Sequence, residues 1–323
     1  MRPTREPEAA QDVGVIGAPS SIGLRPDHRT GEPQQVNQAP STLRSVGLLE
    51  RLRASDRGDV VPPPYQDFNR PPGRPRNEMA VLGYSHSLGR AVGAGIGEHR
   101  FLVVLGGDCS IVLGCLVGAG HARSRVGLAY VDAHADFATP EESETGSAAS
   151  MALALAVGHG DSALARLSGS SPLVQSSDVA LVGRRDFEQP SYGHAALARS
   201  GILDLPGEAL DPSAIPATAN AVLDRVARPD LGGFWIHVDC DVLNPDLMPA
   251  TGALEPGGPT GEELGTFLNP LATHPKALGL ALTQYDPSLD TEDASARLLV
   301  ELLAAATRPD PRLSGTTDPQ GTP

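Results

Sequence analysis

Four short apolar runs, each followed by polar residues, constrain the fold of this chain more than any other feature of its sequence. They span residues 101–105, 126–131, 179–182 and 233–238. Stretches with helical patterns, for example 147–157 and 217–226, separate them. Apolar strands that alternate with helices predict a parallel sheet with helices on both faces. Ligands of such sheets bind at the carboxyl ends of the strands, which is where the polar residues gather.

The sequence before these runs predicts further elements of the same α/β fold. The apolar run 13–18 is expected to form a first buried strand, and helices are expected at 41–53 and 78–98. Glycine- and proline-rich segments at 19–40 and 56–77 show no periodicity and predict loops.

Composition indicates one large domain with unstructured ends. Hydrophobic residues make up 40% of the 323-residue chain, which is enough for a substantial core. Residues 1–11 and 307–323 are poor in apolar side chains, so we expect disordered tails at both ends. With no clear linker between them, residues 12–306 are expected to form a single domain.

Charge and cysteine content exclude several classes of function. The net charge is −14 and no basic cluster is visible, which argues against nucleic-acid binding. No apolar stretch of about 18 residues predicts a membrane span, and the N-terminal residues do not resemble a secretory signal. Three cysteines are too few and too uneven for a disulfide framework, so we expect a reducing, cytoplasmic location.

Two acidic motifs at predicted strand ends carry the chemistry. Asp132, His134 and Asp136 alternate directly after the run 126–131, and in extended chain they would point to one side. A second motif, Asp239-Cys-Asp241, follows the run 233–238. Each aspartate taken alone could cap a helix or turn. Four carboxylates and an imidazole at one sheet edge are better explained by divalent cations, and this oxygen-rich set suits Mn²⁺.

Three longer strings resemble the metal-site motifs of the arginase/agmatinase/formimidoylglutamase, or ureohydrolase, family. They are LGGDCS (105–110), YVDAHADF (130–137) and HVDCDVLNPDLMPATGALEPGG (237–258). In the family the same motifs read GGDHS, DAHxD and DxDxxDP…TGTPEPGG, in this order. The resemblance implies a three-layer α/β/α fold with a mainly parallel central sheet. It also implies a trimeric or hexameric assembly of identical chains and a small-molecule substrate.

The resemblance also implies two Mn²⁺ ions, held by two overlapping sets of ligands. One set is Cys109, Asp132, Asp136 and Asp239, and the other is Asp132, His134, Asp239 and Asp241. Asp132 and Asp239 would bridge the ions, and a hydroxide held between them would attack the central carbon of an amidine or guanidinium. Asp241 would accept the proton of this nucleophile, so Asp132 and Asp241 are the expected catalytic residues.

Three positions depart from the family pattern. Cys109 replaces a histidine ligand, so its site could hold a softer metal or no metal at all, and Cys109 could instead be a packing residue. Ala149 stands where a histidine passes protons to the leaving amine. Gln284 replaces the glutamate that pairs with the substrate guanidinium, and a neutral amide cannot make that charged, bidentate contact.

Two functions remain open after these departures. The first is a metal-dependent hydrolase of linear C–N bonds with an atypical substrate, such as a formimidoyl group, an N-hydroxyguanidine or a neutral amide. The second is a catalytically impaired homologue that keeps a metal or ligand site. The carboxylate motifs are complete, which favours the enzyme.

The remaining candidate residues concern the substrate and the surroundings of the metals. By resemblance, the substrate contacts are Asp186, Glu188, Gln284 and Thr251; a solvated loop is an equal alternative for the first two. His237 lies two residues before Asp239, so both side chains share a face of the strand. It could support a ligand carboxylate or Cys109 by a hydrogen bond, or it could bond a backbone carbonyl as an ordinary buried histidine.

Overall fold

A computed structural model describes residues 13–27, 30–66, 70–169, 172–188 and 193–308. Its centre is an eight-stranded sheet in the order β2-β1-β3-β8-β7-β4-β5-β6. Every pair of neighbouring strands is parallel. The strands are β1 (Val13–Ala18), β2 (Ser55–Asp59), β3 (Phe101–Gly106), β4 (Val126–Val131), β5 (Val179–Val182), β6 (Leu203–Leu205), β7 (Gly233–Asp239) and β8 (Ala277–Thr283).

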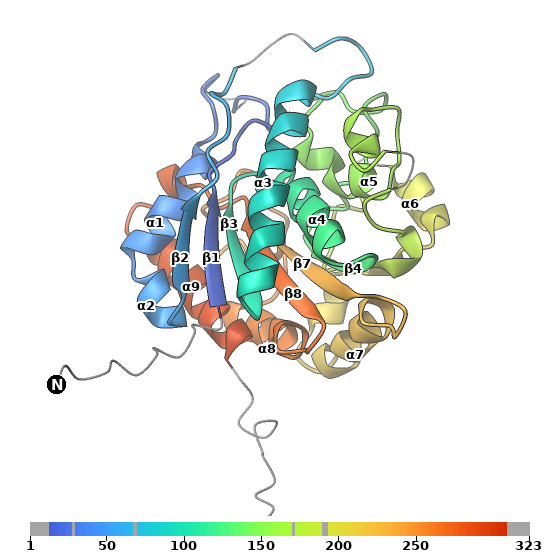
Figure 1. Ribbon diagram of the computed structural model, residues 1–323. Coiled ribbons are helices and arrows are strands. Elements are labelled where there is room, and N and C mark those ends of the chain that lie inside the picture. Colours follow the sequence, from blue (N-terminus) through green and yellow to red (C-terminus); the bar gives the residue numbers. More distant parts are fainter. Residues whose placement is uncertain (1–12, 28–29, 67–69, 170–171, 189–192, 309–323) are drawn as a thin grey trace, which may run out of the picture.

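Helices cover both faces of this sheet, each with its own hydrophobic core. One face packs against α3 (Glu78–Glu98), α4 (Ile111–Ala122), α5 (Ala152–Ala156) and α6 (His194–Ser200). The other packs against α1 (Ala39–Ser45), α2 (Leu48–Leu52), α7 (Ile215–Val226), α8 (Gly261–Ala272) and α9 (Ala294–Thr307). In Figure 1, α3 and α4 lie across the front of the sheet. The arrangement confirms the expected three-layer α/β/α fold.

The central strands are almost entirely apolar because both of their faces are covered. Every residue of β3, β4, β7 and β8 is buried. Apart from His237 within β7, charged and strongly polar side chains gather at the points where these strands end. After β3 the chain turns so tightly that a Cβ at Gly107 would lie 1.9 Å from the Ser20 carbonyl oxygen. Glycine is required there, and the turn places Asp108 and Cys109 at the sheet edge.

Several elements differ from those predicted. The expected helix 41–53 is two helices, α1 and α2, separated at Gly47, whose φ of 91° is left-handed. The expected loop 56–77 begins within strand β2, whose sequence SDRGD carries no apolar pattern because it lies at the edge of the sheet. Strands β6 and β8 were also not predicted.

Residues 1–11 and most of 307–323 lie outside the described residues, although α9 includes Thr307, which was expected in the C-terminal tail. No helix of the described ranges is long and apolar enough to cross a membrane.

Candidate metal centre

Four neighbouring strands deliver polar side chains to one edge of the sheet. In the order β3-β8-β7-β4, the strand ends carry Cys109, Thr283, Asp239 and Asp132. Asp239 and Thr283 are register partners across β7 and β8. The parallel sheet thus brings together residues that are up to 174 positions apart in the chain, as between Cys109 and Thr283.

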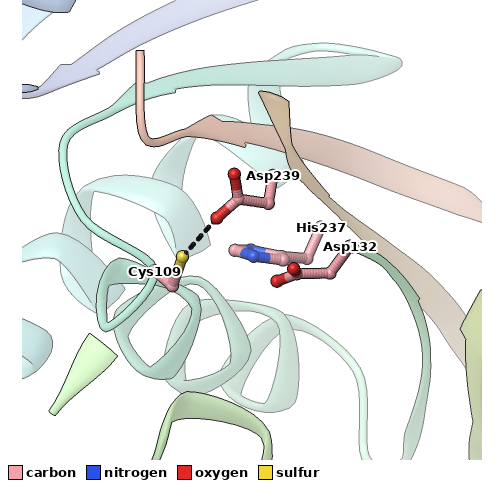
Figure 2. A group of neighbouring side chains, drawn as sticks. All are labelled: Cys109, Asp132, His237 and Asp239. Carbon is pink, nitrogen blue, oxygen red and sulfur yellow. Dashed lines mark hydrogen bonds between the residues drawn. The ribbon is translucent and has the colours of Figure 1, made fainter. Parts of the chain in front are cut away.

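The first group of donors, called here the cysteine cluster, consists of Cys109, Asp132, His237 and Asp239. Each offers one ligand atom, and these atoms all lie within 4.8 Å of one another. The Cys109 thiol donates a hydrogen bond to Asp239 Oδ2 at 2.8 Å (Figure 2). All four residues are buried. The set of donors contains one sulfur, one imidazole and two carboxylates.

His237 lies within the cysteine cluster because β7 directs it to the same face as Asp239. Its ring stacks on Tyr130, its register partner on β4, with 4.2 Å between the ring centroids. Its Nε2 lies 3.5 Å from Thr283 Oγ1, whereas Nδ1 is buried without a hydrogen-bond partner. Burial lowers the pKa of His237 to about 3, so the ring is neutral.

The second group, called here the histidine cluster, consists of Asp132, His134 and Asp241. His134 Nδ1 lies 2.9 Å from Asp241 Oδ2. Burial alone would lower the pKa of His134, but the charge of Asp241 and hydrogen bonds to Asp132 and Asp241 raise it well above its ordinary value. The pKa of Asp241 is lowered although burial opposes this, because His134 stabilises its charge. This cluster therefore contains an ion pair when no cation is bound.

Two buried carboxylates, Asp132 and Asp239, make the centre suitable for cations. Burial, followed by the charge of Asp241, raises the pKa of both Asp132 and Asp239 well above the ordinary range. Asp132 Oδ1 accepts the His134 backbone N–H at 2.7 Å, but Asp132 Oδ2 is buried without a partner. Buried carboxylates and unpartnered polar atoms are costly unless a cation compensates them. The residues present therefore fit divalent metal ions.

Asp136 is the predicted ligand that lies outside both clusters. Its Oδ2 instead accepts a hydrogen bond from the Tyr130 hydroxyl at 2.6 Å. Its backbone is left-handed, with φ at 46°, so the chain is not extended from Asp132 to Asp136 as the alternation assumed. Burial raises the pKa of Asp136 to about 7. The other five predicted ligands, Cys109, Asp132, His134, Asp239 and Asp241, lie in the two clusters.

A cleft of about 380 Å³ opens onto the centre. His134, Asp136, Asp239 and Asp241 form its floor, and Thr251 and Gln284 are among its other lining residues. Cys109, Asp132 and His237 do not line it. The cleft therefore reaches the histidine cluster, while the cysteine cluster is sealed except at Asp239.

The other two expected substrate contacts lie elsewhere. Asp186 is buried and accepts the Ala135 N–H at 2.9 Å and an Arg184 N–H at 3.1 Å. It thus supports the loop that carries His134. Glu188 is exposed. Neither residue lines the described cleft.

Three residues near the centre were not identified as site residues from the sequence. Glu255 Oε1 lies 3.5 Å from His134 Nε2, Arg25 lines the cleft, and Tyr130 bonds Asp136 and stacks on His237. Tyr130 could have been found, because it precedes Asp132 by two residues and must share its face of the strand. Glu255 and Arg25 lie in loops, whose paths carry no comparable periodicity.

Comparison with known proteins gives a consistent result. Residues 11–307 match a family model described as the Arginase family. An arginase of Staphylococcus aureus is 26% identical over 298 residues, which is 90% of this chain and 95% of that protein. A native crystal structure of arginase from Bacillus caldovelox has a TM-score of 0.82 at 26% identity and covers 93% of this chain and 99% of its own. Formimidoylglutamase of Bacillus subtilis shares the fold, with a TM-score of 0.69 at 19% identity over 94% and 88% of the two chains.

Proposed function

Because this chain belongs to the arginase family, we propose that it is a metal-dependent hydrolase of linear C–N bonds. The observation that supports this most strongly is the pair of buried donor clusters, joined by Asp132, at the bottom of a cleft. A cleft above clustered, buried carboxylates with shifted pKa values is typical of a catalytic site rather than of a structural one.

We expect one divalent cation in each cluster, with Asp132 contributing to both. Divalent cations would supply Lewis acidity and would lower the pKa of water toward neutrality, which makes a nucleophile available. The chain's own residues provide the rest of the site. Asp241 lines the cleft beside His134, so it is placed to accept a proton there, the role that the family resemblance gives to this position.

The walls of the cleft favour a substrate other than a simple guanidinium. Gln284 offers an amide, which cannot form the charge-assisted pair that a carboxylate forms with a guanidinium. Ala149, also in the lining, can neither donate nor accept a proton. We therefore propose that L-arginine and agmatine are poor substrates, and that the substrate carries a formimidoyl, N-hydroxyguanidine or amide group.

The test is a hydrolysis screen with metal-depleted and reloaded protein. Release of ammonia, urea or amine would be measured across guanidino, amidino, formimidoyl and amide compounds, with Zn²⁺, Mn²⁺ or both present. We expect at least one compound to be hydrolysed in a metal-dependent manner, with L-arginine and agmatine ~30- to 5,000-fold slower, since a lost charged contact costs ~2–5 kcal/mol.

Two results would contradict the proposal in different ways. Hydrolysis of arginine or agmatine at ordinary enzymatic rates would refute the proposed substrate class. Metal-loaded protein that hydrolyses no compound would favour the alternative, a homologue that binds a metal or ligand without catalysis.

A further inference from the structure

The cysteine cluster contains an imidazole at a position where the family resemblance places no metal ligand. We propose that His237 binds the cation of this cluster directly, together with Cys109, Asp132 and Asp239, and that this ligand set selects Zn²⁺ over Mn²⁺. The inference deepens the proposed metal dependence, but it does not require that the protein hydrolyse any substrate.

The positions of the four side chains support direct binding. One ring nitrogen of His237 lies within 4.8 Å of the Cys109 sulfur and of carboxylate oxygens of Asp132 and Asp239. Figure 2 shows the ring between Asp239 and Asp132, directed toward the sulfur. A central cation within ordinary bond lengths, ~2.0–2.3 Å, needs donors separated by no more than about twice that distance. The donors lie within 4.8 Å of one another, so shifts of a few tenths of an ångström would bring all four to bonding distance of one cation.

Two atoms of the cluster lack any other role in the described structure. His237 Nδ1 and Asp132 Oδ2 are both buried and have no hydrogen-bond partner. Native proteins rarely leave such groups unsatisfied, because the lost hydrogen bond is not replaced by water. A histidine kept only for packing would be expected to bond a backbone carbonyl, and His237 Nδ1 does not. A cation bound through Nδ1 of His237 and Oδ2 of Asp132 would satisfy both atoms at once.

The surroundings of His237 leave a lone pair free on Nδ1. Thr283 Oγ1 donates to the Val238 carbonyl at 3.3 Å, so its own lone pairs are available to the Nε2–H, 3.5 Å away. That arrangement favours the tautomer with the proton on Nε2. Stacking on Tyr130 fixes the plane of the ring. Such supporting contacts are those that orient metal-binding histidines in general.

The ligand set determines the preferred metal. Thiolate and imidazole are softer donors than carboxylate, and a site with one of each and two carboxylates suits Zn²⁺. The histidine cluster has no sulfur, so carboxylates dominate it and Mn²⁺ suits it better. The Cys109 thiol donates a hydrogen bond to Asp239 Oδ2. On cation binding it would lose this proton to solvent through the cleft that Asp239 lines and become a thiolate ligand, while Asp239 stays a carboxylate.

In this proposal the imidazole ligand that Cys109 has replaced is supplied instead by His237. A cysteine side chain after β3 is shorter than a histidine, and the ring of His237 approaches its sulfur from β7, two strands away. On β8 the register partner of His237 is Ala281, whose small side chain leaves the ring unobstructed on that side.

X-ray absorption of the full-length protein with one equivalent of Zn²⁺ tests the inference. We expect one sulfur neighbour at about 2.3 Å and one imidazole. Cys109→Ser should remove the sulfur, whereas Cys115→Ser, which changes a buried cysteine outside the clusters, should retain it. His237→Gln should remove the imidazole signal. It should also weaken Zn²⁺ binding at least ~100-fold, because loss of a group that only supports a ligand already costs up to ~100-fold.

His134→Gln should leave the imidazole signal in place.

Circular dichroism confirms in each case that the variant is folded. Either of two results would overturn the inference. The first is a zinc environment without sulfur in the wild type. The second is an imidazole signal that survives in His237→Gln and disappears in His134→Gln. If the zinc environment is as expected but no compound is hydrolysed, the proposed catalysis fails and this inference stands. If the protein hydrolyses a substrate but its zinc has only oxygen and nitrogen neighbours, this inference fails and the proposed catalysis stands.

Discussion

The two donor clusters share Asp132 but differ in almost every other respect. The cysteine cluster is sealed in the core, whereas the histidine cluster forms the floor of the cleft. The imidazole of the sealed cluster is neutral and bonds no carboxylate, while the imidazole of the open cluster is paired with Asp241 at 2.9 Å. We therefore expect the two clusters to have different tasks: the sealed cluster holds a metal, and the cluster that lines the cleft also contacts the substrate.

The difference also shows how each cluster tolerates the absence of a cation. The open cluster neutralises its carboxylates with the proton on His134, whose pKa is raised well above its ordinary value by Asp241, despite burial. The sealed cluster contains no protonated imidazole, because His237 is neutral. Its negative charge is limited by keeping protons on Cys109 and on the carboxylates, because burial raises the pKa of Cys109 and Asp239.

The largest effect is expected from the residue that the clusters share. Asp132→Asn keeps the shape of the side chain but removes its charge from both clusters, so we expect each cation to bind at least ~100-fold more weakly. Metal content after dialysis, measured by elemental analysis, should fall almost to zero. Asp246→Asn, at an exposed loop position, is the matched control and should keep the full content. An Asp132→Asn protein with two bound cations would remove the basis for treating the clusters as one centre.

A second comparison separates the tasks of the two imidazoles. His134→Gln removes the imidazole that lines the cleft, so we expect turnover of the best substrate to fall ~100- to 1,000-fold, in the range of a lost catalytic contact. The cation of the sealed cluster should be retained. His237→Gln should instead release that cation. Equal metal loss and equal rate loss in the two variants would show that the clusters are not functionally distinct.

Changing the cleft wall should alter substrate preference without altering either cluster. Gln284→Glu introduces a carboxylate where the amide lines the cleft. A charged contact with a guanidinium should raise kcat/KM for L-arginine or agmatine ~10- to 100-fold, equivalent to ~1.4–2.7 kcal/mol. Zinc and manganese content should stay as in the wild type. An unchanged preference would mean that the substrate does not reach Gln284.

The smallest expected change is a shift in metal preference within the sealed cluster. A Cys109→His/His237→Ser double variant moves the imidazole from β7 back to the loop after β3 and removes the sulfur. Loss of the soft donor should raise Mn²⁺ affinity relative to Zn²⁺ by about 10-fold. Competition between the two metals, read by elemental analysis, measures this ratio. A ratio equal to that of the wild type would favour a packing role for Cys109.

The sequence predicted which side chains lie together at the sheet edge where strands impose a direction on them. Asp132, Asp239 and His237 follow from the two-residue period of β4 and β7, and the parallel sheet brings their strand ends together. That His237 belongs among the donors could not be derived, because the distance to Cys109 depends on the register of separate strands. Asp136 shows the opposite case: its left-handed backbone interrupts the alternation.

The fold was predictable for similar reasons. Buried strands such as β3 and β4 are continuous apolar runs, so they are visible in the sequence. The edge strand β2 contains SDRGD and is held by pairing with β1 rather than by burial of apolar side chains, so no pattern marks it. The break between α1 and α2 lies at the left-handed Gly47, and both helices contact α9, which is far away in the sequence.

The central claim is that the two clusters hold two different cations. Native mass spectrometry of metal-depleted protein, reloaded with one equivalent of Zn²⁺ and an excess of Mn²⁺, measures it directly, because limiting zinc fills its preferred site first and leaves the other to manganese. The account predicts one zinc and one manganese per chain. Protein that binds no cation, only one cation, or two manganese ions with no zinc would contradict it.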